Sequence, residues 1–249
     1  MRPSAPRKAR SIVTDHVTNN LTDNQTDHFE RDQTAHERTA GGHAERDHML
    51  AGELYNAADP ELARLREHAH RLCVDFNRTH ESDTVQRAAI LTELLPHCGE
   101  GSDVAGPIFF DYGEFTTFGD HVYANFNLTV LDVCPVTVGN HVMFGPNVTL
   151  ATPIHPMRWQ DRNVRKAADG STFDYEYGAP ITIGDNCWLA SGVTVAGGVT
   201  IGAGSVIGAG SVVTRDIPPN SFAAGVPCRV IRGIDEGDAM DMPTRVPEV

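Results

Sequence analysis

The sequence predicts a mainly β protein built as a coil of short, flat strands. An aliphatic residue recurs at every sixth position from Ile183 to Val213, and a small residue follows nearly every one. The same frame occurs upstream at Val138-Gly139 and Phe144-Gly145. A period of six fits neither an α-helix nor one long alternating strand. It fits stacked coils of three strands each, in which the aliphatic residues point inward and form one continuous core.

Four segments of different composition follow one another along the chain. Residues 1–47 are polar with few large apolar side chains, so we expect this extension to be disordered. Residues 48–98 are expected to form a helical cap, because Asp59-Pro60 is typical of a helix start and Pro96 of a helix end. Residues 99–234 are expected to form the coil, interrupted by a loop at 151–180, and residues 235–249 an acidic tail without a period.

Composition limits the classes of partner. The chain has 249 residues and a net charge of −13, from 33 acidic and 20 basic residues, which disfavours binding to nucleic acid phosphates. No apolar run approaches the roughly 20 residues of a membrane-spanning helix. The five cysteines are widely spaced and include no Cys-x-x-Cys pair, which favours reduced thiols in a cytoplasmic protein. We therefore expect small molecules and further copies of the chain as partners.

The loop at 151–180 is where we expect chemistry. A loop of about thirty residues inside a regular solenoid is usually either functional or disordered. It contains His155, which lies between Pro153 and Pro156 just past a coil, and the carboxylate of Glu176. Periodicity alone leaves two interpretations of His155 open, a catalytic group and a surface histidine in a mobile loop. Glu176 could orient His155, close over an acceptor, or be a solvated loop carboxylate.

Other candidate groups in the coil have simpler explanations. His121 and His141 could join His155 in a metal site, but each occupies the third place of its hexad, a turn position that points to solvent. The glycines between residues 197 and 210 keep the six-residue frame, so they are expected at corners and not in a phosphate-binding loop. The sequence therefore predicts no metal site.

Several segments carry a resemblance to one family. Residues 49–62 resemble the N-terminal cap of maltose and galactoside acetyltransferases, and four further segments resemble the coil of these enzymes: Tyr123-Ala-Asn-Phe-Asn-Leu-Thr129, Gly145-Pro-Asn-Val-Thr-Leu150, Pro180-Ile-Thr-Ile-Gly184 and residues 217–232. The resemblance runs from about Met49 to Ile234 and is closest to the maltose acetyltransferase branch of the hexapeptide-repeat sugar O-acetyltransferases. It implies a left-handed parallel β-helix, a homotrimer with active sites between subunits, and acetyl-CoA as cosubstrate without a metal.

The resemblance also implies roles for individual residues. His155 matches the general base, which takes the proton of an acceptor hydroxyl as that hydroxyl attacks the thioester, so no covalent enzyme intermediate is needed. Ser191 matches the residue whose backbone N–H faces the thioester oxygen. Asn125 matches an acceptor-binding residue, and Tyr123 lies beside it in the sequence. The residues that match contacts to acetyl-CoA are Ser191, Trp188, Ala209, Thr214, Arg215 and Arg232. For Trp188, packing at a coil corner is an equal alternative.

The chain departs from the galactoside enzymes at three positions. It has Ala57 and Val133 where they have aspartates, and Asp111 where they have a serine, so Asp111 is a candidate for the carboxylate that holds sugar hydroxyls. The predicted function is acetyl transfer from acetyl-CoA to a hydroxyl of a maltose- or glucose-like sugar. The alternatives are a non-sugar hydroxyl, an amino sugar or an antibiotic as acceptor, a catalytically silent trimeric scaffold, and a metal-dependent carbonic anhydrase of the γ class.

Overall fold

The computed structural model describes residues 43–241. The expected disordered extension lies outside this range except for residues 43–47, and the end of the expected tail, 242–249, lies outside it as well. Helix α2 (Ala44–Ala51) begins ahead of the expected cap boundary at residue 48. No helix within residues 43–241 is long and apolar enough to cross a membrane.

The cap consists of α2, strand β1 (Tyr55–Asn56), α3 (Pro60–Asn77) and α4 (Thr84–Leu94). Helix α3 starts where the sequence predicts, because the Asp59 carboxylate accepts hydrogen bonds from the N–H groups of Glu61 and Leu62. Its apolar side is buried against the coil. The end of α3 is fastened to β4, since the Asn77 amide donates to the Ile108 carbonyl at 2.9 Å and accepts from the Ile108 N–H at 2.8 Å.

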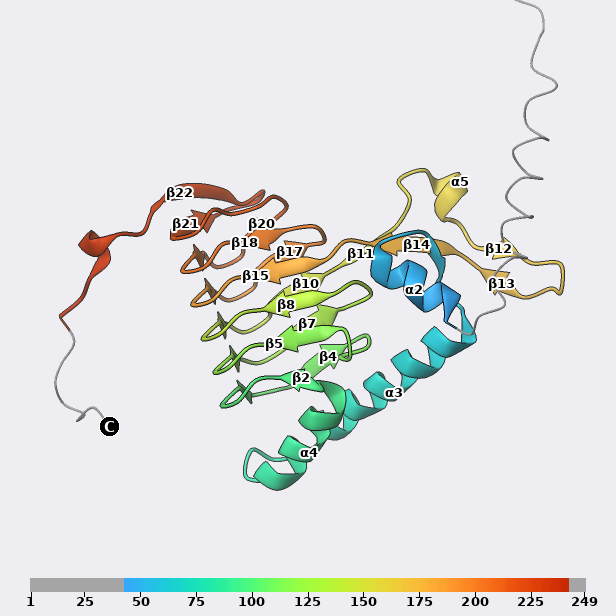
Figure 1. The fold of residues 1–249 in the computed structure, drawn as a ribbon, viewed down its shortest axis with the longest axis horizontal. Coiled ribbons are helices and arrows are strands. Elements are labelled where there is room, and N and C mark those ends of the chain that lie inside the picture. Colours follow the sequence, from blue (N-terminus) through green and yellow to red (C-terminus); the bar gives the residue numbers. More distant parts are fainter. Residues whose placement is uncertain (1–42, 242–249) are drawn as a thin grey trace, which may run out of the picture. The chain divides into compact units, whose positions relative to one another are not determined.

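The rest of the chain winds through three parallel sheets, and the coils stack from β2 toward β22 (Figure 1). Sheet I contains β2 (His97–Cys98), β5 (Thr116–Phe118), β8 (Val136–Val138), β15 (Ile181–Ile183) and β18 (Thr200–Ile201). Sheet II contains β3 (Asp103–Val104), β6 (Tyr123–Ala124), β9 (Met143–Phe144), β16 (Trp188–Leu189), β19 (Val206–Ile207) and β21 (Ser221–Ala224), with β22 (Arg229–Gly233) added antiparallel. Sheet III contains β4 (Ile108–Phe110), β7 (Leu128–Leu131), β10 (Thr149–Ala151), β17 (Thr194–Ala196) and β20 (Val212–Val213). The chain visits sheets I, II and III in turn, so the parallel β-helix predicted from the period of six is confirmed.

The core of the β-helix consists of the inward-pointing residues of all three sheets. The aliphatic residues of the six-residue frame are at most 1% exposed: Ile183, Leu189, Val195, Ile201, Ile207 and Val213. Residues on either side of them along each strand point outward, as the two-residue repeat of a β-strand requires. The prediction of a continuous aliphatic core is therefore confirmed.

The corner between sheets I and II carries left-handed backbone. His121 and His141 lie there with φ of 56° and 55°, both exposed, so their predicted turn positions are confirmed. Their rings stack with centroids 4.9 Å apart. Asparagine takes the equivalent position in the following coil, at Asn186 with φ of 59°.

The predicted loop at 151–180 is a structured insertion between two coils. It contains β11 (Pro153–Ile154), α5 (Trp159–Arg162), β12 (Arg165–Lys166), β13 (Thr172–Phe173) and β14 (Tyr175–Gly178). Strand β14 lies between β1 of the cap and β11 in a small antiparallel sheet. The insertion and the cap are therefore joined to each other through backbone hydrogen bonds. A short 3₁₀ turn, Glu236–Asp238, follows β22.

Candidate functional site

The residues predicted to form the site lie on two different edges of the β-helix. The III–I corner, where the chain leaves sheet III for sheet I, carries Asp111, His155, Thr214 and Arg215. The II–III corner, where it leaves sheet II for sheet III, carries Asn125, Ser191 and Ala209. Tyr123 and Trp188 lie within sheet II, and Arg232 lies in β22. Each corner brings residues of several coils together, but a complete strand of sheet III separates the two groups.

His155 at the III–I corner faces a carboxylate. It directly follows β11, and its Nε2 lies 3.4 Å from Oε2 of Glu176 on the neighbouring strand β14. The His155 side chain is 48% exposed, whereas that of Glu176 is 14% exposed. The imidazole can therefore meet an incoming molecule on one side while the carboxylate behind it is largely shielded from water.

The other carboxylate oxygen of Glu176, Oε1, is hydrogen-bonded to a residue of the cap. The hydroxyl of Tyr55 donates a hydrogen bond to Oε1 of Glu176, and Tyr55 is fully buried. Burial, followed by the hydrogen bond to Glu176, holds the pKa of Tyr55 far above its ordinary value, so this hydroxyl stays protonated and acts as a donor. The two oxygens of Glu176 are thus divided between the cap and His155.

Helix α3 lies over the other predicted carboxylate at the III–I corner. His70 Nε2 is 3.6 Å from Oδ1 of Asp111. Burial raises the pKa of Asp111, and the neighbouring His70 opposes that shift. One turn earlier on α3, the Arg66 guanidinium donates to the Tyr112 hydroxyl at 3.2 Å and to the Ala57 carbonyl at 3.4 Å. The cap therefore adds positive and titratable groups to this corner.

The II–III corner presents backbone groups to solvent. Ser191 is exposed, and within residues 43–241 no group accepts a hydrogen bond from its N–H. Gly145 lies beside it in the preceding coil, and a Cβ added there would be 2.7 Å from the Ser191 nitrogen. Glycine at 145 therefore keeps this backbone close-packed without crowding the exposed N–H. Further along the same edge, Asn125 uses its side-chain oxygen to accept from the Phe126 N–H at 2.7 Å.

The predicted contacts to acetyl-CoA differ in their surroundings. Thr214 and Arg215 are exposed. Arg232 forms a bidentate pair with Asp238, at 2.6 and 2.8 Å, and this pairing lowers the pKa of Asp238 to about 2. A phosphate would therefore have to displace Asp238 from Arg232, whereas Arg215 is directly accessible. Trp188 is 47% exposed on the outer face of sheet II, where its ring is available for contact.

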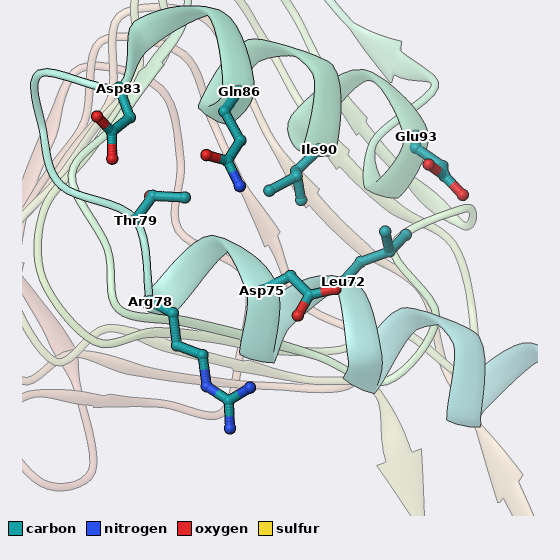
Figure 2. A pocket seen from close by; sticks show the side chains of 8 residues that line it. All are labelled: Leu72, Asp75, Arg78, Thr79, Asp83, Gln86, Ile90 and Glu93. Atoms are coloured by element: carbon teal, nitrogen blue, oxygen red, sulfur yellow. The ribbon is translucent and has the colours of Figure 1, made fainter.

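A hollow of about 460 Å³ lies in the cap between α3 and α4 (Figure 2). Leu72 and Ile90 contribute its apolar part, and Asp75 and Glu93 lie at its polar rim. None of the predicted site residues lines it, so it is separate from the candidate site. In the part of the chain that the structure describes, no three His, Cys, Asp or Glu side chains are placed to hold a metal ion.

Comparisons with known proteins agree with this fold. Residues 48–99 match the maltose acetyltransferase hexapeptide capping motif, and residues 180–215 match the bacterial transferase hexapeptide (six repeats) model. The galactoside O-acetyltransferase of Escherichia coli is 43% identical over 190 residues, which cover 76% of this chain and 89% of the relative. The chain belongs to the hexapeptide-repeat acetyltransferase family.

Two solved structures of this hexapeptide-repeat acetyltransferase family have the same architecture. A maltose O-acetyltransferase from Clostridium difficile 630 is 43% identical with a TM-score of 0.68, over 77% of this chain and 98% of the other. A galactoside acetyltransferase in complex with coenzyme A is 40% identical with a TM-score of 0.68, over 78% of this chain and 92% of the other.

The sequence of this hexapeptide-repeat acetyltransferase did not indicate three cap residues that contact groups around the candidate site: Tyr55, Arg66 and His70. Arg66 and His70 are spaced by four residues on α3, which places them on one helix face, and that spacing could have indicated a polar patch. Tyr55 lies in a strand of two residues, which is too short to carry a hydrophobic period. Only the pairing of β1 with β14 brings it to Glu176.

Proposed function

We propose that this protein transfers the acetyl group of acetyl-CoA to a hydroxyl group of a sugar, with His155 as general base. The observation that carries the proposal is the contact of His155 with the shielded carboxylate of Glu176 at the open edge of the coil. The similarity to proteins named galactoside and maltose O-acetyltransferases, one of them in complex with coenzyme A, supports the same activity.

The geometry of His155 suits proton transfer. With Nε2 facing the Glu176 carboxylate, the imidazole proton is held at Nε2 and the lone pair is left at Nδ1. As the acceptor oxygen bonds to the thioester carbonyl carbon, its proton passes to Nδ1. The carbon–sulfur bond then breaks, and the imidazolium returns that proton to the leaving thiolate, giving the acetyl ester and the free thiol. Glu176 supports the positive charge that His155 carries in between.

The Ser191 N–H is proposed to stabilise the negative charge on the thioester oxygen, because an exposed backbone N–H without a partner is a suitable donor for a developing oxyanion. The acceptor is proposed to bind to Asp111, Asn125 and Tyr123, with His70 beside Asp111.

Acetyl-CoA is proposed to bind to Thr214, Arg215, Ala209, Trp188 and Arg232. Arginine is suited to the phosphates of that molecule.

A complete site is proposed to need two copies of the chain. Three residues of β10 span about 10 Å at roughly 3.3 Å per residue, so His155 and Ser191 lie on edges too far apart to act on one thioester. A second copy that places its II–III corner against the III–I corner of the first would unite them. Repetition of this contact around a three-fold axis gives the homotrimer that the family resemblance implies.

The proposed function assigns a part to each segment of the chain. The expected bounds of the cap, 48–98, shift at both ends, because α2 begins at Ala44 and β2 (His97–Cys98) is a strand of sheet I. We propose residues 44–96 as the cap, 97–234 as the catalytic β-helix, and the flanking segments as extensions outside the reaction. The cytoplasm is the proposed compartment, since all five cysteines carry free thiols and four of them are buried.

The test is free-thiol release from acetyl-CoA with maltose, glucose, galactosides and chito-oligosaccharides as acceptors. His155→Ala is expected to lower kcat by about 10²–10⁴-fold, the usual contribution of a positioned general base. His80→Ala, which changes an exposed histidine in the turn between α3 and α4, is the matched control and should retain wild-type turnover. Sugar-dependent turnover that persists in His155→Ala would remove His155 from the mechanism, and absence of acetyl-CoA binding would overturn the transferase assignment.

A further inference from the structure

Strand β1 is fixed at both of its ends. Three residues before it, Gly52 ends α2 in a left-handed conformation with φ of 75°. The N–H of Asn56 donates to the Glu45 carboxylate at 2.6 Å, and Asp59 then caps α3. A two-residue strand held in this way has little freedom to shift relative to the strand that it pairs with.

The partner strand is β14 of the insertion, in a register that places Tyr55 opposite Glu176. Side chains directly opposite one another in an antiparallel pair have Cβ atoms about 4.5–5.5 Å apart and leave the same face. The Tyr55 ring is fully buried, and its hydroxyl reaches Oε1 of Glu176. Oε2 is then directed at Nε2 of His155, 3.4 Å away.

We propose that Tyr55 is a positioning residue for His155, which acts by holding one oxygen of Glu176 so that the other faces the imidazole. This inference rests on the proposed function and extends it to the cap. Tyr55 itself does not touch substrate, because no part of its side chain is exposed. The cap therefore takes part in setting the orientation of the base, through one hydroxyl group.

A buried tyrosine hydroxyl in this protein does not need Glu176 as its hydrogen-bond partner, as a second buried tyrosine shows. The hydroxyl of Tyr112 is satisfied within the cap and coil by Arg66 at 3.2 Å. Tyr55 instead extends its hydroxyl across the sheet to the insertion, to the same carboxylate that contacts His155. A phenylalanine at position 55 would fill the same apolar space and lack only this link.

The experiment compares Tyr55→Phe with wild type in the sugar acetylation assay. Loss of orientation at a base that contributes about 10²–10⁴-fold is expected to lower kcat by about tenfold, with KM for acetyl-CoA within about twofold of wild type. Tyr177→Phe is the matched control, because Tyr177 is the next residue on β14 and its side chain leaves the opposite face of the strand. The control is expected to retain wild-type kcat.

The link through Glu176 is tested by a double-mutant cycle. Tyr55→Phe introduced into Glu176→Gln is expected to lower kcat no further, because the two groups act as one unit. Additive losses, an unchanged kcat in Tyr55→Phe, or a loss confined to KM for acetyl-CoA would each overturn the role of Tyr55. If His155→Ala and Glu176→Gln themselves leave turnover unchanged, the proposed function fails instead, so the two failures are distinguishable.

Thermal unfolding shows whether Tyr55→Phe is folded at the assay temperature. Should this variant not fold, fluorotyrosines incorporated at position 55 keep the shape of the ring and change the acidity of the hydroxyl. We then expect kcat to change systematically with the acidity of the hydroxyl at position 55, at constant KM for acetyl-CoA. A constant kcat across the fluorotyrosine series contradicts the proposal.

Discussion

Asp132 offers a direct test of the electrostatics at the III–I corner. It follows β7 and is fully buried, and its two oxygens accept hydrogen bonds from the Tyr112 N–H and the Thr116 hydroxyl, each at 2.9 Å. Burial raises the pKa of Asp132 from 3.8 to about 6, although both hydrogen bonds act in the opposite direction. The ionised carboxylate is therefore held in place at a cost in free energy.

Replacement of Asp132 by asparagine is expected to stabilise the protein at neutral pH. Because the folded-state pKa is raised, the stability associated with the protonated acid is fully present below pH 3.8 and is lost as the pH rises through about 6. A shift of roughly two pKa units corresponds to about 3 kcal/mol. Asparagine has the shape of the protonated acid, with an oxygen for the Tyr112 N–H and an NH₂ group for the Thr116 oxygen. The gain of Asp132→Asn should approach about 3 kcal/mol at pH 7.5 and fall below about 1 kcal/mol at pH 4.

Urea unfolding followed by circular dichroism, at one protein concentration and several pH values, measures this difference. Asp103→Asn, which changes an exposed aspartate at the start of β3, serves as the control for the loss of one negative charge. A free-energy difference between Asp132→Asn and wild type that does not vary between pH 4 and pH 8 would refute the reasoning. So would a variant that is less stable than wild type at pH 7.5, since it would mean that the anion is the favoured form.

Three further predictions concern the cap and the thiols. Asp59→Ala removes the acceptor for two N–H groups at the start of α3 and should lower the free energy of unfolding by about 1 kcal/mol, measured in urea. Asn77→Ala removes the two hydrogen bonds that the Asn77 side-chain amide makes with the N–H and carbonyl of Ile108, and it should lower the free energy of unfolding by about 2 kcal/mol in the same measurement. Of the five cysteines only Cys98 is exposed, so in the native protein Ellman's reagent should react with Cys98 first and with the remaining four only on unfolding.

The β-helix could be predicted because its physical cause is repeated along the chain. Each coil needs an inward aliphatic residue and a small residue at the corner, and the stretch from Ile183 to Val213 meets that requirement at every sixth position. Neighbouring coils lie close in sequence, so a local period determines the three-dimensional register. For the same reason the start of α3 at Pro60 followed from one local signal, the preceding Asp59.

The contacts around His155 depend on pairing between strands that are far apart in the sequence, which no local pattern indicates. Tyr55 and Glu176 are separated by 121 residues and meet through strands of two and four residues, which are too short to carry a period. The sequence placed Glu176 in the same loop as His155 but could not direct its carboxylate, because the direction is imposed by the pairing of β14 with β1 and β11. His70 likewise reaches Asp111 only after α3 has packed against β4.

The insertion between β10 and β15 does not interrupt the ladders of the β-helix. Strand β10 before it pairs with β17 after it, Leu150 against Val195, in the same parallel register as with β7 on the other side, Leu150 against Val130. Sheet I is equally continuous, with Val136 against Ile181. The ladders of the coil are therefore complete without the segment that supplies His155 and Glu176, and that segment is joined to the cap through β1 and β14. Replacement of this segment by one of another length or composition is expected to alter the chemistry at the III–I corner while the winding of the coil is retained. Differences in acceptor preference are therefore expected to arise from this segment.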